Sequence, residues 1–194
     1  MMLLQVLTLA RLAGPLDSAV VRDVQVAPGE TLRTTSVGRG EAILLLPGVF
    51  GAAYGYRSVM GLLVEQGYRC IVVEPLGYGW SSHPKKADYS FAAQTVRVSE
   101  ALDSLGVTRA LVVAQSSSAS IAFRLAVAQP SLVRGVLSID GGPSEIPDEQ
   151  RELLRLRLTD FAADTVPGSG QFIHEEQPDV VVDAVAELHL AAGE

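Results

Sequence analysis

One stretch of sequence decides the fold, and it reads Leu111-Val112-Val113-Ala114-Gln115-Ser116-Ser117-Ser118-Ala119. A short apolar run passes directly into small and polar residues, after which a helical pattern extends to about Ala128. This order predicts a strand that turns sharply into a helix and lifts Ser116 clear of the backbone. Ala114 and Ser118 are small enough to let the flanks of such a turn approach closely. Ser116 is then expected to point into a site, beside the unpaired N–H groups of the first helical turn.

A simpler interpretation of the same stretch stays open. Serine is a preferred residue at helix N-termini, so a strand followed by an ordinary helix cap also accounts for these residues.

Composition narrows the class of protein. The chain has 194 residues, of which 48% are hydrophobic, and we expect one domain over residues 1–194 with enough apolar material for a core. The net charge of −7 argues against a nucleic-acid partner, because no basic stripe would attract phosphates. The single cysteine, Cys70, lies in an apolar run and is expected to be buried in a strand. No disulfide can form within one chain that has a single cysteine.

The first ten residues are apolar, lack a basic residue and are too short to span a bilayer. We therefore expect no membrane span and a cytoplasmic protein whose N-terminus packs on the surface as a helix. A degenerate or clipped export signal is left open.

Strand-like and helix-like segments alternate along the chain. Residues 21–26 and 31–37, separated by Pro28-Gly29, predict an opening hairpin. Continuous apolar runs at 42–46, 70–74, 110–114 and 133–139 suit strands that are buried on both faces. Helical patterns lie between them at 56–66, 91–105 and 118–128. The order predicts an α/β fold, in which a mostly parallel sheet carries helices on both faces.

The pattern changes after Gly142. A charged helical segment at 148–158 is followed by a weak stretch at 162–166 and by an amphipathic terminal helix. One face of that helix carries Val181, Val182, Val185 and Leu188.

Four motifs in this order resemble the α/β-hydrolase superfamily, most closely its esterase, epoxide-hydrolase and haloalkane-dehalogenase-like branch. They are Leu46-Pro47-Gly48-Val49-Phe50-Gly51, then Glu74-Pro75-Leu76-Gly77-Tyr78-Gly79-Trp80-Ser81, then the turn around Ser116, then Gly168-Ser169-Gly170-Gln171-Phe172-Ile173-His174-Glu175-Glu176-Gln177-Pro178. The resemblance implies a three-layer fold with Ser116 as nucleophile. An oxyanion hole would be formed by the N–H of Val49 or Phe50 and by that of Ser117.

A dinucleotide-binding fold is the structural alternative, because Gly77-Tyr78-Gly79 follows a strand. However, Ser82 stands at the third position of that fingerprint, and no helix is expected to open there.

The chain differs from the α/β-hydrolase superfamily at the position of the general base. Resembling proteins carry a histidine base in the last motif, and here that position is Gln171, whose amide cannot take up a proton at neutral pH. We expect the Gln171 amide to approach the Ser116 hydroxyl. His174 is a substitute base if the loop is rearranged, or else a surface histidine at the start of the last helix. His83 is expected in an exposed turn, and His189 beside a helix C-terminus.

The orienting acid is the second uncertain member of a triad. Asp140 follows the sixth strand and is either that acid or a turn residue before Gly141. Glu145, Asp160 and Asp164 are weaker alternatives. Neither a metal nor a cofactor is expected, since His174-Glu175-Glu176 lacks the second histidine of a helical zinc motif.

Length predicts an uncovered site. Only about twenty residues separate Pro143 from Val166, too few for the helical cap and the late strand of family members, so we expect both to be missing. Phe50, Trp80 and Ile146 should then line an open groove beside Ser116, filled by a small-molecule substrate or ligand, a partner protein or a second copy of the chain.

Two functions follow from the sequence. The first is a small, lidless serine hydrolase of weak activity that acts on carboxylic esters of small or hydrophobic substrates. Ser116 would attack, with Asp140 and a substitute base such as His174 activating it. The second is a catalytically silent scaffold that binds a hydrophobic small molecule or a partner. Gln171 favours the second, and the turn with its oxyanion loop favours the first.

Overall fold

A mixed, mostly parallel sheet forms the centre of the molecule. The computed structural model describes residues 16–141, 149, 152–153, 156, 162 and 164–193. Within them, six strands pair in the order β1-β2-β4-β3-β5-β6. Their bounds are Val20–Ala27 for β1, Glu30–Gly38 for β2, Ala42–Leu46 for β3, Arg69–Val73 for β4, Ala110–Gln115 for β5 and Val133–Ile139 for β6.

The sheet contains both antiparallel and parallel strand pairs. β1 and β2 form the predicted hairpin, and β2 pairs antiparallel with β4. β4, β3, β5 and β6 are parallel to one another. The carboxyl ends of these four strands therefore meet at one edge of the sheet, where loops can bring distant residues together.

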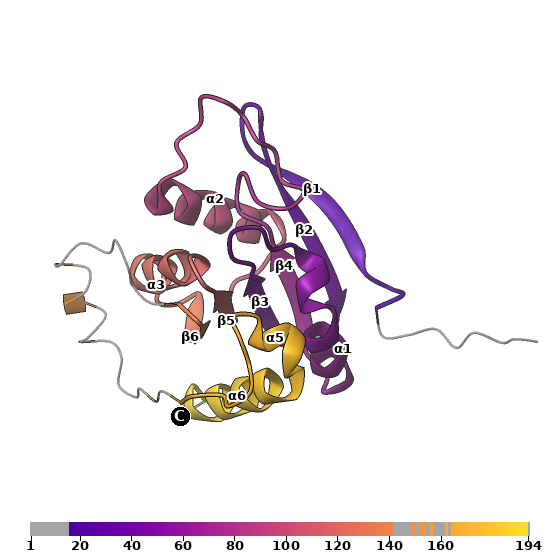
Figure 1. Cartoon of the computed structure of the whole chain (residues 1–194). Helices are drawn as coiled ribbons and strands as arrows, with labels where there is room; N and C mark the ends of the chain where they lie inside the picture. The colour runs from indigo at the N-terminus through magenta and orange to yellow at the C-terminus, as the bar shows by residue number, and fades with distance from the viewer. Residues whose placement is uncertain are drawn as a thin grey trace, which may run out of the picture.

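Helices cover both faces of the sheet (Figure 1). α2 (Phe91–Ser104) and α3 (Ser118–Ala128) lie on one face, and α1 (Arg57–Glu65) and α6 (Pro178–Ala191) lie on the other. Two short elements, η1 (Ala53–Tyr56) and α5 (Ile173–Glu176), precede α1 and α6. The predicted α/β class, with a mostly parallel sheet between helical layers, is confirmed.

The core follows the two-residue period of the strands. In β3, Leu44 and Leu46 join the cluster under α2 and α3, while Ile43 and Leu45 join the cluster under α1 and α6. Because both faces are covered, every residue of β3 is buried, and an unbroken apolar run is the result.

Two local predictions are also confirmed. On α6, Val181, Val182 and Val185 are buried and Leu188 packs beside them. Cys70 is a free, buried thiol in β4, and burial raises its pKa to about 12.

Several predictions fall on residues outside those described, namely the helix at 1–10, Glu145, Ile146, Asp160 and most of the helical segment at 148–158. Across the described ranges, no helix combines the length and apolar character that crossing a membrane requires.

Candidate active site

Ser116 stands in a strained turn between β5 and α3. β5 ends at Gln115 and α3 begins at Ser118, as the sequence predicts. Ser116 adopts a φ of 53°, a left-handed conformation that is rare for residues other than glycine and that costs on the order of 1 kcal/mol or more. Its N–H donates to the carbonyl oxygen of Ile139 in β6 at 2.8 Å. Ser117 is the helix N-cap, but its side chain makes no capping hydrogen bond, so an ordinary serine cap does not account for this turn.

Close packing holds the turn in place. A Cβ atom at Gly141 would collide with the carbonyl oxygen of Ser116 and lie 2.8 Å from Cβ of Ala119. Ser118 is fully buried, and its hydroxyl donates to the carbonyl oxygen of Pro47 at 2.5 Å. The start of α3 is thereby bound to the loop that follows β3.

The loop after β3 presents unpaired N–H groups. Gly51 N–H donates to the Gly48 carbonyl at 2.9 Å, and Val49 and Phe50 form the middle of this turn. Phe50 has a φ of 67°. Among the residues described, neither Val49 N–H nor Phe50 N–H finds an acceptor, and the same is true of Ser117 N–H. These are the groups that the sequence nominates as oxyanion donors.

Two glutamines connect this loop to the last motif. Gln115, which is 2% exposed, accepts a hydrogen bond from Gly48 N–H at 3.0 Å and donates from Nε2 to the Gln171 carbonyl at 3.4 Å. Gln171 in turn places its Nε2 3.4 Å from Oγ of Ser116. The predicted approach of the Gln171 amide to the Ser116 hydroxyl is confirmed.

His174 is buried, so its alternative placement on the surface is wrong. Its ring lies 4.6 Å from the Tyr56 ring and 6.1 Å from the Phe172 ring, measured between centroids, and is 4% exposed. Burial lowers its pKa, and the Glu175 and Glu176 carboxylates oppose this shift. No hydrogen bond joins His174 to Ser116 in the described part of the chain, and Nδ1 of His174 has no partner there.

The remaining histidines lie in other surroundings. His83 is exposed, in the loop just before the turn at residues 85–86. His189 sits in the last turn of α6, as expected, with Nδ1 3.0 Å from a Glu41 carboxylate oxygen.

Asp140 follows β6 with a φ of 48° and is exposed. Within the described ranges it makes no hydrogen bond or ion pair, so the structure does not join it to a histidine. Asp164 is exposed and accepts a hydrogen bond from the Thr165 N–H at 2.7 Å.

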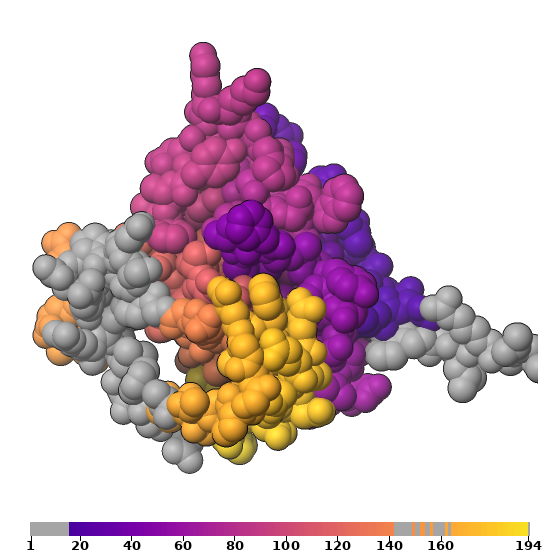
Figure 2. All heavy atoms as spheres, viewed as in Figure 1, coloured from indigo at the N-terminus to yellow at the C-terminus, as the bar shows by residue number. Residues whose placement is uncertain are grey.

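Aromatic side chains are exposed on the loops that follow β3 and β4. Phe50 is 99% exposed and Trp80 74%. Tyr54 and Phe172, which the sequence did not nominate, are 73% and 43% exposed. In Figure 2 the purple residues after β3 stand out at the centre of the face shown, next to the yellow C-terminal segment. Ile146, the third residue predicted for a groove here, lies outside the described residues.

Glu74 was not predicted from the sequence to contribute to the site. It is 1% exposed and follows β4, where Oε1 accepts from Ala53 N–H at 2.9 Å and Oε2 from Trp80 N–H at 2.5 Å. The carboxylate therefore joins the loops after β3 and β4. The signal in the sequence was a charged residue at the end of an apolar strand.

Tyr78 was also missed. Its hydroxyl lies 3.2 Å from the Ser117 hydroxyl and brings the loop after β4 to the start of α3. The signal was its position between Gly77 and Gly79. Gly77 N–H donates to the Ser82 carbonyl at 3.0 Å in a turn, and the helix that a dinucleotide site requires does not begin there.

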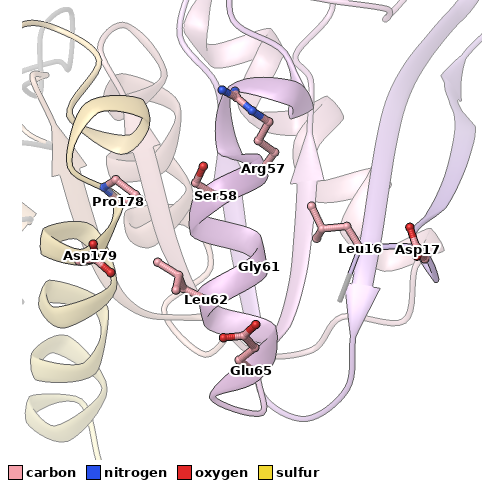
Figure 3. A pocket seen from close by; sticks show the side chains of 9 residues that line it. All are labelled: Leu16, Asp17, Arg57, Ser58, Gly61, Leu62, Glu65, Pro178 and Asp179. Atoms are coloured by element: carbon pink, nitrogen blue, oxygen red, sulfur yellow. The ribbon is translucent and has the colours of Figure 1, made fainter. Parts of the chain in front are cut away.

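A separate pocket lies between α1 and α6, and Figure 3 shows its lining. Arg57, Glu65, Pro178 and Asp179 contribute to it, together with Leu16 and Asp17 from before β1. None of the residues nominated for the site belongs to this pocket. No group of three or more His, Cys, Asp or Glu side chains in the described ranges is placed to hold a metal ion.

The family model of the alpha/beta hydrolase fold matches residues 41–172. The chain belongs to this family. It is 29% identical over 139 residues to an epoxide hydrolase of Caballeronia sordidicola, and the aligned region covers 68% of this chain and 42% of the relative. It is 25% identical over 167 residues to a haloalkane dehalogenase of Bradyrhizobium diazoefficiens, covering 81% of this chain and 53% of the relative. Bifunctional epoxide hydrolase 2 of Mus musculus is 27% identical over 118 residues, 60% of this chain and 21% of the relative. The chain thus spans about a fifth to about half of these relatives.

Solved structures agree with this assignment. A loop variant of a haloalkane dehalogenase from Bradyrhizobium elkanii has a TM-score of 0.58 at 31% identity, over 63% of this chain and 40% of that one. A predicted hydrolase from Thermoplasma acidophilum has a TM-score of 0.72 over 91% of this chain and 99% of that one. Its identity is 13%, so the second likeness shows the fold alone.

Proposed function

We propose that the chain is a small hydrolase of carboxylic esters that uses Ser116 as its nucleophile and turns over slowly. The observation that carries this proposal is the strained Ser116 turn, which has an amide nitrogen 3.4 Å from the hydroxyl. Among the described residues, the N–H groups of Ser117 and of Val49 and Phe50 in the loop after β3 find no acceptor. Strain of this kind persists where surrounding structure enforces it, and it is concentrated at functional sites.

The unpaired N–H groups give the proposed site its main chemical capacity. N–H groups of Val49, Phe50 and Ser117 are fixed before substrate arrives, because turn and helix geometry already holds them. Preorganised donors stabilise a developing oxyanion without having to reorganise during the reaction.

The proposed reaction has two stages, acylation of Ser116 and hydrolysis of the acyl-serine. Oγ of Ser116 bonds to the ester carbonyl carbon, the π electron pair moves to the carbonyl oxygen, and the hydroxyl proton passes to water. The alkoxide then leaves as an alcohol after taking a proton from water. A second water attacks the acyl-serine, releases the carboxylic acid and restores the hydroxyl.

Gln171 explains why turnover would be slow. Its Nε2 donates to Ser116 Oγ, and an amide does not accept the hydroxyl proton. Loss of the base from a serine triad costs about 10⁴ to 10⁶ in rate and leaves about 10³ over water. Without rearrangement of the last motif, His174 stays against Tyr56 and does not supply that base.

Exposed aromatic residues favour small or hydrophobic acyl groups as substrates. Phe50 and Trp80 extend from the two loops that border the proposed oxyanion hole. An uncovered set of aromatic side chains is usually occupied by a ligand or a partner. A second copy of the chain, packed face to face as a homodimer, is the partner we propose alongside the substrate.

A second function rests on Gln171 itself. As a hydrogen-bond donor beside unpaired N–H groups, its amide suits a bound carbonyl or carboxylate oxygen better than it suits proton transfer. A silent scaffold that binds such a ligand would keep the same turn without catalysis.

Active-site labelling separates the two functions. A fluorophosphonate bonds to a nucleophilic serine and does so more slowly when no base activates it, so the hydrolase proposal predicts slow, stoichiometric labelling that peptide mapping assigns to Ser116. Ser116→Ala should abolish it, and Ser58→Ala in α1 should leave it unchanged. Ester binding without any labelling would favour the scaffold.

A further inference from the structure

A second group of charged side chains lies at the edge of the sheet opposite Ser116. Arg69 is the first residue of β4, Arg134 the second of β6, and Arg109 directly precedes β5. Because β3 to β6 are parallel, their amino ends meet at this edge. The three arginines line one pocket together with Glu41, Thr108 and His189.

The lining carries excess positive charge in an acidic protein. Among the lining residues that the structure describes, three guanidinium groups face a single carboxylate, that of Glu41, whereas the whole chain has a net charge of −7. Guanidinium groups stay charged at any pH at which the protein is folded. The described lining therefore holds two positive charges more than negative ones.

Arg134 is fixed in this pocket. Its side chain is 10% exposed and forms an ion pair with one oxygen of Glu41. The other oxygen of Glu41 lies 3.0 Å from Nδ1 of His189. Nε of Arg134 is buried and has no hydrogen-bond partner in the described part of the chain. A buried guanidinium that keeps an unpaired donor is costly unless another group completes its hydrogen bonds.

Arg69 and Arg109 keep most of their donors available. Nε of Arg69 donates to the Ser36 hydroxyl at 3.3 Å. Arg109 is exposed and makes no side-chain hydrogen bond or ion pair with any residue that the structure describes. Both side chains border the same hollow as Arg134.

We propose that this pocket binds a phosphate group, either as inorganic phosphate or as the phosphate of a small monoester. A phosphate monoester carries close to two negative charges at pH 7, which match the uncompensated charge of the lining. The planar guanidinium fork matches phosphate oxygens and forms charge-assisted hydrogen bonds with them. A carboxylate ligand would neutralise only half of the excess charge. The proposal does not depend on the chemistry of Ser116.

Titration calorimetry at constant ionic strength tests the proposal. The probes are inorganic phosphate and phenyl phosphate, with acetate as the singly charged comparison. We expect at least one phosphate probe to bind and acetate to bind at least about tenfold more weakly. Tighter binding of phenyl phosphate than of inorganic phosphate identifies a monoester ligand, and the reverse order identifies free phosphate.

Variants locate the binding to this pocket. Arg109→Ala should weaken phosphate binding at least about tenfold, because charge-assisted hydrogen bonds are lost. Arg109 is exposed in a loop, so this variant should fold even if Arg69→Ala does not. Arg22→Ala, on the exposed face of β1, is the matched control and should bind like the wild type.

Three results would overturn the proposal. The first is no binding of either phosphate probe up to ~10 mM. The second is acetate binding as tightly as phosphate. The third is equal weakening in Arg109→Ala and Arg22→Ala, which would indicate attraction to overall charge.

Discussion

Gln171 places its amide nitrogen 3.4 Å from the hydroxyl oxygen of Ser116, so a hydrogen-bond donor stands at the serine. The backbone carbonyl of Gln171 is at the same time 3.4 Å from Nε2 of Gln115. The last motif is therefore held against the turn by two contacts, one from a side chain and one from the backbone. If the proposed function holds, the rate of ester hydrolysis is limited because Gln171, which cannot accept a proton, stands at Ser116.

Gln115 is expected to position both the oxyanion loop and the last motif. Gln115→Ala removes the acceptor for Gly48 N–H and leaves buried groups unpaired, so the free energy of unfolding should fall by about 1–3 kcal/mol. Fluorophosphonate labelling of Ser116 should also slow. Gln115→Glu keeps the acceptor for Gly48 N–H but loses the donor to the Gln171 carbonyl and buries a carboxylate, so it should recover only part of the stability. Urea denaturation and labelling kinetics provide the measurements, with Gln25→Ala on β1 as control. Unchanged labelling in a folded Gln115→Ala protein contradicts this role.

Glu74 is expected to stabilise the two loops that border the site. Glu74→Ala leaves the N–H groups of Ala53 and Trp80 without their acceptor, and the free energy of unfolding should fall by about 2–4 kcal/mol. Glu74→Gln retains one acceptor and should lose about half as much. Glu100→Ala, on the exposed side of α2, should change stability by no more than about 0.5 kcal/mol in the same urea titrations. Equal effects of Glu74→Ala and Glu100→Ala would show that the carboxylate does not join the loops.

His174 is expected to make stability depend on pH. Burial lowers its pKa below the ordinary value of 6.5, so the unfolded chain takes up the proton first as pH falls. Its contribution to stability is therefore complete above pH 6.5 and is lost as pH falls from there through the folded pKa. His174→Phe keeps an aromatic ring against Tyr56 and removes this dependence.

Denaturant titrations at about pH 7.5 and pH 5.5 bracket that window. The wild type should lose stability between them, His174→Phe should lose less, and the exposed His83→Asn should behave like the wild type. An identical loss in the wild type and in His174→Phe means that other groups set the pH dependence. The Asp88 carboxyl, whose pKa is lowered by hydrogen bonds from Ser90, titrates below this range.

Local pattern was enough to predict the elements that surround the site. Apolar runs such as 42–46 and 110–114 predict buried strands because both faces of the sheet are covered. Residue sizes around Ser116 predict the sharp turn, since a larger side chain at Ala114 or Ser118 would obstruct it. Strand β4 differs slightly from its predicted range, because Glu74 leaves the strand to bind two loops.

Contacts between distant loops could not be predicted in this way. Gln115 binds Gly48, which is 67 residues away, and the ring that buries His174 belongs to Tyr56. The strand order determines which loops meet. It cannot be predicted from the hydrophobic periodicity of any single segment. For the same reason the contact of Tyr78 was not predicted, because its hydroxyl reaches Ser117 from the loop after β4.

The rate at which Gln171→His hydrolyses p-nitrophenyl acetate tests the proposed function most directly. A histidine at this position adds a proton acceptor beside Ser116, and the rate should rise at least about tenfold over the wild type. The gain should disappear in the double variant with Ser116→Ala, and Gln25→His should hydrolyse the ester like the wild type. A wild type that is already fast, depends on Ser116 and gains nothing from Gln171→His contradicts the account, because another group would then serve as the base.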